Sequence, residues 1–144
     1  MHTEDNGNNW AQVYVTPEYL GNVYGFIFRG EDYGYAYGEG GILRTTNAGQ
    51  FWDTAGTYRS SVIDLAIVND SLVFALGGSS SGRIYYIERS TDRGKHWEIQ
   101  LQVNYNLQTL YFLNDSTGWA TGLLDYPSGF TVLRYRNNTW STIR

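Results

Sequence analysis

Short apolar segments separated by polar, glycine-rich stretches recur along the whole chain. Within many of these segments bulky residues alternate with small or polar ones at a period of two, which is typical of β-strands, and no stretch carries a helical period. The pattern therefore predicts thirteen strands and no helix. We expect the strands at residues 9–16, 22–28, 35–38, 41–45, 51–57, 62–68, 72–76, 84–90, 96–103, 107–113, 119–123, 130–135 and 139–143.

Three segments within this pattern align with one another without gaps, at residues 28–38, 67–77 and 112–122. Each contains the end of one strand, a polar turn, and a second strand in which a small residue lies between bulky ones. The alignment divides the chain into repeated units of four strands. We place the units at about 22–57, 62–103 and 107–144, with a leading strand at 9–16 before the first.

An eight-residue motif recurs between the third and fourth strands of these units. Its clearest copy reads Ser-Thr-Asp-Arg-Gly-Lys-His-Trp at residues 90–97; further copies lie at 3–10 and 45–52, and a shortened copy lies at 135–140. Successive copies end 42, 45 and 43 residues apart, which is the length of a four-stranded β-propeller blade. The repeat therefore predicts a β-propeller.

The residues that the copies share are suited to folding rather than to catalysis. A hydroxyl or carboxylate beside a tight turn can bond to local backbone groups, and a glycine at the fifth position supplies positive φ. The final tryptophan can cover the turn with a large apolar body. We assign the following residues to hairpin closure: Thr3, Asp5, Gly7, Trp10, Thr45, Asn47, Gly49, Trp52, Ser90, Asp92, Gly94, Trp97 and Trp140.

The pattern Ser/Thr-x-Asp-x-Gly-x-x-Trp on such a hairpin resembles the Asp-box, or BNR, repeat family of β-propellers. Residues 115–122, together with residues 42–49 of the equivalent unit, are similar to the photosystem II stability and assembly-factor-like branch. The resemblance implies an all-β fold with three blades of four antiparallel strands and a spare leading strand, in a single partial-propeller domain over residues 1–144. The resemblance also implies that the eight-residue motif has a structural role, because family members with different activities share the motif.

Composition agrees with this fold class and narrows the possible partners. The chain has 17% aromatic residues, 17 glycines and two prolines, a balance that favours strands and tight turns. A net charge of −4 gives no broad surface for nucleic acid or anionic membranes, and no apolar run is long enough to insert into a membrane. The absence of cysteine excludes a disulfide framework and a cysteine nucleophile.

No metal site and no cofactor are expected. Residues 5–9, Asp-Asn-Gly-Asn-Asn, resemble part of a calcium loop but lack the later bidentate glutamate, and the two histidines are isolated. The N-terminus lacks the basic and apolar regions of a secretory signal, yet the chain begins inside a repeat. We expect a bacterial protein that is secreted or extracytoplasmic, with its signal absent from this chain; a cytoplasmic location stays open.

The arginine positions bear on whether the protein is an enzyme. Arg44, Arg89 and Arg134 recur at intervals of 45 residues, so we expect them on equivalent strands, pairing with neighbouring blades or turn carbonyls. A sialidase-like site would need converging arginines, an activated tyrosine and an acidic residue, and no motif unites the remaining arginines. We predict no catalytic residues; the alternative is a fragment of a glycosidase or sialidase-like propeller.

Ligand binding is expected at the loops that join fourth to first strands and second to third strands. These loops share one face of a propeller and differ most between the units. Tyrosine and arginine are favoured at recognition surfaces. The candidate binding residues are Tyr19, Glu39, Tyr58, Arg59, Arg83, Tyr105, Asp125 and Tyr126. The predicted function is a non-enzymatic scaffold that binds a protein or a glycan, or supports assembly.

Three blades are too few to close a propeller, which typically has four to eight. An unclosed stack would leave apolar faces and strand edges in water. We therefore expect a homodimer in which two chains complete a six-bladed ring. The alternative is an excised or designed propeller fragment that assembles into a full ring.

Overall fold

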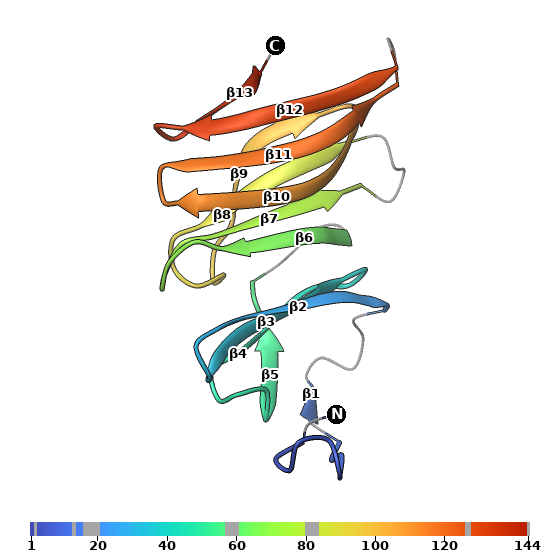
Figure 1. Ribbon diagram of the computed structural model, residues 1–144, viewed down its shortest axis with the longest axis vertical. Coiled ribbons are helices and arrows are strands. Elements are labelled where there is room, and N and C mark those ends of the chain that lie inside the picture. Colours follow the sequence, from blue (N-terminus) through green and yellow to red (C-terminus); the bar gives the residue numbers. More distant parts are fainter. Residues whose placement is uncertain are drawn as a thin grey trace.

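The computed structural model describes residues 1, 3–12, 14–15, 21–56, 61–79, 84–125 and 128–143. Three β-sheets are stacked face to face, with the N-terminal turn at one end of the stack and β13 at the other (Figure 1). No helix occurs among the described residues. The predicted all-β class, with four antiparallel strands in each of three units, is confirmed.

The first sheet contains a four-stranded antiparallel meander and one additional short strand. The meander consists of β2 (Val23–Arg29), β3 (Tyr33–Gly38), β4 (Gly41–Thr45) and β5 (Phe51–Thr54). The strand β1 (Tyr14–Val15) pairs with β5 in parallel and extends the sheet at that edge. The strand order is therefore β1-β5-β4-β3-β2.

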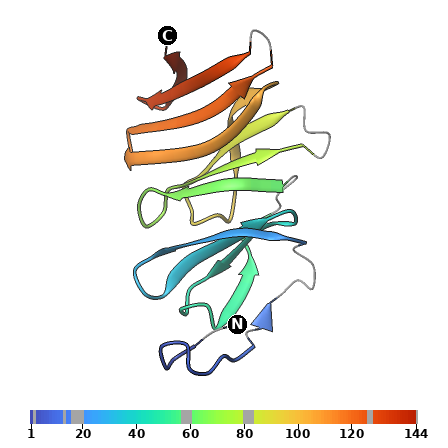
Figure 2. The same cartoon turned by 45° about the vertical axis from the view of Figure 1, so that its right-hand side comes forward.

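The second and third sheets repeat the meander. The second consists of β6 (Ser61–Ile67), β7 (Val73–Gly78), β8 (Tyr85–Ser90) and β9 (Glu98–Val103). The third consists of β10 (Asn106–Asn114), β11 (Thr117–Leu124), β12 (Gly129–Arg136) and β13 (Thr139–Ile143). The first strand of each meander, β2, β6 or β10, lies next to its counterpart in the neighbouring sheet (Figure 2). The same arrangement is thus used three times.

The twelve meander strands lie where the alternation predicts them, with ends shifted by a few residues. The leading strand is different. A strand was expected from residue 9, but the backbone amide of Asn9 donates to Asp5 Oδ1 at 2.8 Å and the Trp10 indole donates to the Gly7 carbonyl at 3.0 Å. These bonds keep residues 3–10 in the turn, so the predicted start is wrong. The strand is also not spare, because β1 pairs with β5.

Every residue of β7 is buried because a sheet covers the strand on each side. Val73 and Ala75 face the first sheet, whereas Phe74 and Leu76 face the third. Successive side chains of a strand point to opposite faces, so one apolar run serves two interfaces. The alternation in this part of the sequence is therefore between two cores rather than between core and solvent.

Two apolar clusters hold the stack together. One joins the first and second sheets and includes Tyr35 and Leu65. The other joins the second and third sheets and includes Phe74, Ile87 and Tyr135. All five side chains are buried. In the described part of the chain, no further sheet covers the outer faces of the first and third sheets.

Candidate binding surfaces

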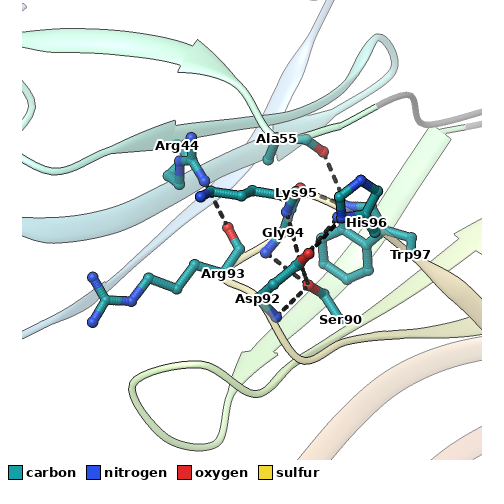
Figure 3. A network of polar contacts seen from close by, with 9 residues as sticks. All are labelled: Arg44, Ala55, Ser90, Asp92, Arg93, Gly94, Lys95, His96 and Trp97. Carbon is teal, nitrogen blue, oxygen red and sulfur yellow. Dashed lines mark hydrogen bonds and ion pairs between the residues drawn. The ribbon is translucent and has the colours of Figure 1, made fainter.

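The turn between β8 and β9 contains the hydrogen-bond network of the repeated motif (Figure 3). The Ser90 hydroxyl donates to Asp92 Oδ1 at 2.8 Å and accepts from the Gly94 amide at 2.8 Å. Asp92 Oδ1 also accepts from the amides of Lys95 and His96, each at 3.0 Å. These donors, first among them the His96 amide, hold the pKa of Asp92 well below its usual range. The polar side chains of the motif are thus occupied in closing the hairpin.

The same network closes two other copies of the motif. We call the copies at residues 3–10, 45–52 and 90–97 the full-length turns. In each, a hydroxyl accepts from the amide of the glycine four residues later, at 2.8 to 2.9 Å. The three glycines have positive φ, from 77° to 87°, which other residues adopt at a cost. The tryptophan then donates Nε1 to the glycine carbonyl at 3.0 to 3.1 Å.

The turn between β12 and β13 differs, and we call it the short turn. Asn137 and Asn138 both have positive φ, 49° and 61°, as in a two-residue hairpin loop. The Tyr135 hydroxyl donates to Asn138 Oδ1 at 2.7 Å. Trp140 packs against the core, but its Nε1 is buried without a hydrogen-bond partner. The short turn lacks the glycine whose carbonyl accepts this proton in the full-length turns.

The full-length turn of the second sheet also fastens that sheet to the first (Figure 3). Trp97 Nε1 donates to the carbonyl of Ala55 at 3.0 Å as well as to that of Gly94 at 3.1 Å. Arg44 Nη1 donates to the Arg93 carbonyl in the same turn at 3.1 Å. The prediction that the repeated arginines bond to neighbouring turns is confirmed for Arg44.

The other two repeated arginines are in a different situation. The Nε atoms of Arg89 and Arg134 are buried without a hydrogen-bond partner. Arg89 lies near Tyr135, the first residue of the short turn. Burial raises the pKa of Tyr135, and the nearby positive charge of Arg89 opposes that rise. Arg134 lies on the third sheet, beyond which the described chain has no further sheet. Neither Nε bonds to a turn carbonyl or to a neighbouring blade, the two kinds of partner that the sequence predicted for these arginines.

Carboxylates connect neighbouring sheets at two places. Asp64 Oδ2 of the second sheet accepts from the Leu110 amide at 2.7 Å and from the Thr109 hydroxyl at 2.9 Å, both in the third sheet. Arg29 Nε of the first sheet forms an ion pair with exposed Asp70 Oδ1 at 2.8 Å. Both carboxylates therefore serve the contact between sheets.

Three candidate loop residues lie in the described part of the chain. Glu39 accepts from the side chain of Asn22 at 3.0 Å, from its amide at 3.2 Å and from the Tyr24 hydroxyl at 3.3 Å, and the Asn22 side chain is the main cause of its lowered pKa. Tyr105 packs partly buried against the core of the second and third sheets, and Asp125 is exposed after β11. No hydrogen bond between described residues unites these three. The other five candidates lie outside the described residues: Tyr19, Tyr58, Arg59, Arg83 and Tyr126.

An open hollow of about 530 Å³ lies beside the N-terminal full-length turn. It is lined by Glu4, Asp5, Asn9, Trp10 and Ala11. Asn9 donates to both carboxylate oxygens of Asp5, from its amide at 2.8 Å and from its side chain at 2.6 Å, and so lowers the pKa of Asp5. The carboxylate beside the hollow is therefore already used to close the turn.

The face of the third sheet that points away from the second sheet is apolar. We call it the third-sheet end face, and it consists of Tyr111, Leu113, Trp119, Leu123, Phe130 and Ile143. Phe130 is 87% exposed, Leu113 63% and Tyr111 61%. The rings of Tyr111 and Trp119 stack with their centroids 6.2 Å apart. Contiguous apolar surface of this kind marks interaction sites.

The opposite end of the stack also carries exposed aromatic residues. Phe26 and Phe28 of β2, which we call the first-sheet end face, are 63% and 44% exposed. Both rings contact that of Trp52, with centroids 5.9 Å apart. Sequence reasoning expected uncovered faces but named none of these residues. For the third sheet a signal was present in the sequence of β10, where apolar residues occur at positions that point to both faces of the sheet. This pattern indicates that the outer face is apolar as well as the core face.

Neither a metal-binding cluster nor a membrane-spanning helix occurs among the described residues. No group of three histidine, aspartate or glutamate side chains in that part of the chain could hold a metal ion. No helix there is long and apolar enough to cross a membrane.

Comparison with known proteins supports the fold. No protein-family model matches the sequence, and a search of curated proteins finds no match. Nine chains of solved structures match. One of them is YCF48 bound to D1 peptide, with a TM-score of 0.66 and 13% sequence identity; the match covers 85% of this chain and 39% of that one. The likeness shows a β-propeller fold, of which the present chain contains three stacked sheets.

Proposed function

We propose that the chain is a non-enzymatic β-propeller of the Asp-box type that serves as an assembly scaffold and binds protein through its exposed sheet faces. The observation that carries this proposal is the third-sheet end face, where Phe130 is 87% exposed. Packing a second sheet on such a face is favourable by about 25 cal/mol per Å² of apolar surface removed from water. The partner that fits is therefore a protein with an apolar sheet face.

The contacts of the acidic residues favour a scaffold over an enzyme. Asp5 and Asp92 close turns, Asp64 joins two sheets, and Glu39 is bonded to Asn22. A glycosidase uses two carboxyl groups that flank a sugar at a defined separation. The alternative, a fragment of a glycosidase or sialidase-like propeller, would require such a pair from other residues of the chain.

The similarity to YCF48 favours protein over glycan as the ligand of the loops. The matched structure contains a D1 peptide. We propose that the loops beside exposed Asp125 likewise receive a segment of another protein, with a glycan as the alternative. The resemblance to the Asp-box family further supports a location outside the cytoplasm.

A second copy of the chain is the other partner that we propose. Two interfaces between sheets are filled within one chain, whereas both ends of the stack expose aromatic residues. Two copies would supply six blades, and propellers have typically four to eight. The pair would thus complete a ring and remove both end faces from water.

Sedimentation velocity tests the assembly function. Phe130→Asp places a charge in the third-sheet end face. Ile99→Asp places the same charge on a residue of β9 that is 54% exposed and lies outside both end faces. We expect the wild-type chain and Ile99→Asp to sediment as assemblies and Phe130→Asp as a monomer. A monomeric wild-type chain, or hydrolysis of a glycan in parallel sialidase and glucanase assays, would contradict the proposal.

A further inference from the structure

We propose that the third-sheet end face of one chain docks head to tail onto the first-sheet end face of a second copy, with Arg134 of one copy donating to the Ala48 carbonyl of the other. The inference rests on the assembly function proposed above and specifies the residues of the contact. It follows from the register that the three sheets share.

The third-sheet end face has the same plan as the two interfaces inside the chain. In every sheet a repeated arginine pairs across strands with an aromatic residue: Arg44 with Tyr35, Arg89 with Phe74, and Arg134 with Trp119. Tyr35 and Phe74 are fully buried because the next sheet covers them. Trp119 occupies the equivalent position on the uncovered face. The third sheet thus exposes the same arginine and ring pair that packs against the next sheet at the two interfaces inside the chain.

The hydrogen-bonding need of Arg134 indicates which kind of sheet can pack on the third-sheet end face. Arg44 donates to the Arg93 carbonyl of a full-length turn at 3.1 Å. Arg89 faces the third sheet, whose turn is the short one, and its Nε has no partner. The Nε of Arg134 is likewise buried and unpartnered. Arg44 forms its bond through Nη1, so a sheet carrying a full-length turn would give the Arg134 guanidinium the kind of carbonyl acceptor that Arg44 has. Such a carbonyl matters because a buried donor without an acceptor is costly.

The first sheet carries a full-length turn in the required position. Ala48 occupies the place in its turn that Arg93 occupies in the second sheet, and both residues have positive φ, 56° and 61°. Both turns are also closed by the same bond from the glycine amide to the hydroxyl at the first position, which supports a similar orientation of the two carbonyls relative to their own sheets. The Ala48 carbonyl is therefore the counterpart of the acceptor that Arg44 uses.

On β2 of the first sheet, Phe26 is exposed at the position where the second and third sheets bury an equivalent residue. Phe26, Leu65 and Leu110 pair with the central alanines of their sheets, Ala36, Ala75 and Ala120. Leu65 is 4% exposed and Leu110 7%, because the preceding sheet covers each of them, whereas Phe26 is 63% exposed. The first sheet therefore exposes Phe26 where the second and third sheets bury their leucines, although Ala36, Leu43 and Trp52 of the same sheet form a small buried cluster. No preceding sheet occurs in the described part of the chain.

Each copy thus offers one face of each kind. A contact between two different faces closes into a ring only if the rotation fits; otherwise it continues as a filament. Two copies contain six meanders, within the typical range of propeller blades. We infer a closed pair with two equivalent contacts.

A mixing experiment tests the head-to-tail contact. Phe130→Asp alters the third-sheet end face and Phe26→Asp alters the first-sheet end face. In a pair of identical variants, every contact contains one substitution. In a mixed pair, one contact contains both substitutions and the other contains none. We expect each variant alone to be monomeric by sedimentation velocity, and an equimolar mixture to regain pairs.

The outcomes separate this inference from the assembly function. If Phe26→Asp associates like the wild type, the contact joins two third-sheet faces and the head-to-tail inference is wrong, although assembly stands. Failure of the mixture to regain pairs, with both variants folded by circular dichroism, also overturns it. A wild-type monomer overturns the inference and the assembly function together; it would leave the faces to a different protein or to further blades of a longer chain.

Arg134→Lys tests the proposed hydrogen bond separately. Lysine keeps the charge but loses the planar donors of the guanidinium. We expect the dissociation constant of the pair to rise about tenfold, as for the loss of one hydrogen bond to a charged group. Arg89→Lys is the matched control, since Arg89 has the same register but faces the short turn, and it should leave the dissociation constant unchanged. Equal effects of both substitutions would contradict the assignment of Arg134.

Discussion

The two interfaces between neighbouring sheets share one register but are held together differently. Between the first and second sheets, a full-length turn supplies polar contacts, in which Trp97 donates to Ala55 and Arg44 to Arg93. Between the second and third sheets the turn is short, and the rings of Phe74 and Phe112 stack with centroids 4.2 Å apart. One interface therefore combines apolar packing with hydrogen bonds from the turn. The other combines aromatic packing with the hydrogen bonds that Asp64 accepts from Thr109 and Leu110.

The comparison shows what the full-length turn contributes. Without it, the Nε atoms of Arg89 and Trp140 are buried and unpartnered. Unpartnered donors destabilise a folded protein, and the aromatic cluster around Phe74 offsets this by packing. A blade can therefore lose part of its motif and still stack, provided that its rings fill the interface.

The largest expected effect comes from removing the centre of the aromatic cluster. Phe74 is fully buried and contacts the rings of Phe112, Tyr135 and Trp140. Phe74→Ala should lower the free energy of unfolding by about 3–5 kcal/mol, because it creates a cavity at the centre of the packed rings. Urea denaturation measures the change. A loss below about 1 kcal/mol, less than typical for such a truncation, would show that the rings do not hold this interface.

A smaller effect distinguishes the two tryptophans. Trp97→Phe and Trp140→Phe remove the same atoms, but Trp97 Nε1 has two carbonyl acceptors and Trp140 Nε1 has none. We expect Trp97→Phe to be the more destabilising by about 1–2 kcal/mol, because it removes satisfied hydrogen bonds whereas the other removes an unsatisfied donor. Urea denaturation of both variants gives the difference. Equal losses would mean that the hydrogen bonds of the full-length turn contribute nothing to the contrast between interfaces.

The smallest effect concerns pH and sharpens the role of the full-length turn. The pKa of Asp92 is lowered from its ordinary value of 3.8, mainly by the His96 amide. A lowered carboxylate pKa stabilises the folded state above the ordinary value, and this stabilisation is lost as the pH falls below it. Asp92→Asn should keep the acceptor but remove the charge, so the wild type should have the higher Tm at pH 7, by on the order of a few degrees. The difference should shrink as the pH falls below 3.8 and should vanish only below the lowered pKa of Asp92 in the folded state. A difference that persists unchanged in acid would exclude the charge as its cause.

Much of the fold could be predicted because it depends on local rules. Alternation located the twelve meander strands, and the repeat period located the turns. In each full-length turn a Ser or Thr, an Asp or Asn, a Gly and a Trp close the hairpin through neighbours in sequence. The predicted strand start at residue 9 was wrong for a local reason too. The amide of Asn9 bonds to Asp5, so the turn extends farther along the chain than the apolar pattern suggests.

The candidate surfaces were harder to predict because they depend on neighbours distant in sequence. Glu39 appears available in a loop, but its acceptors are taken by Asn22 and Tyr24. The residues of the third-sheet end face resemble core residues in the sequence, and they form a surface because no fourth sheet covers them in the described part of the chain. Sequence alone therefore predicted an uncovered face without its residues.

By itself, the sequence determined the four-strand repeat, the hairpin turns and the all-β class, because side-chain alternation and turn chemistry act between residues close along the chain. The tertiary structure decided how equivalent residues differ. Arg44, Arg89 and Arg134 occupy one register, but Arg44 bonds to a full-length turn, Arg89 lies near a short turn, and Arg134 lies on an exposed face. The physical reason is that the partner of each arginine belongs to the next sheet in the stack, and the three sheets have different neighbours.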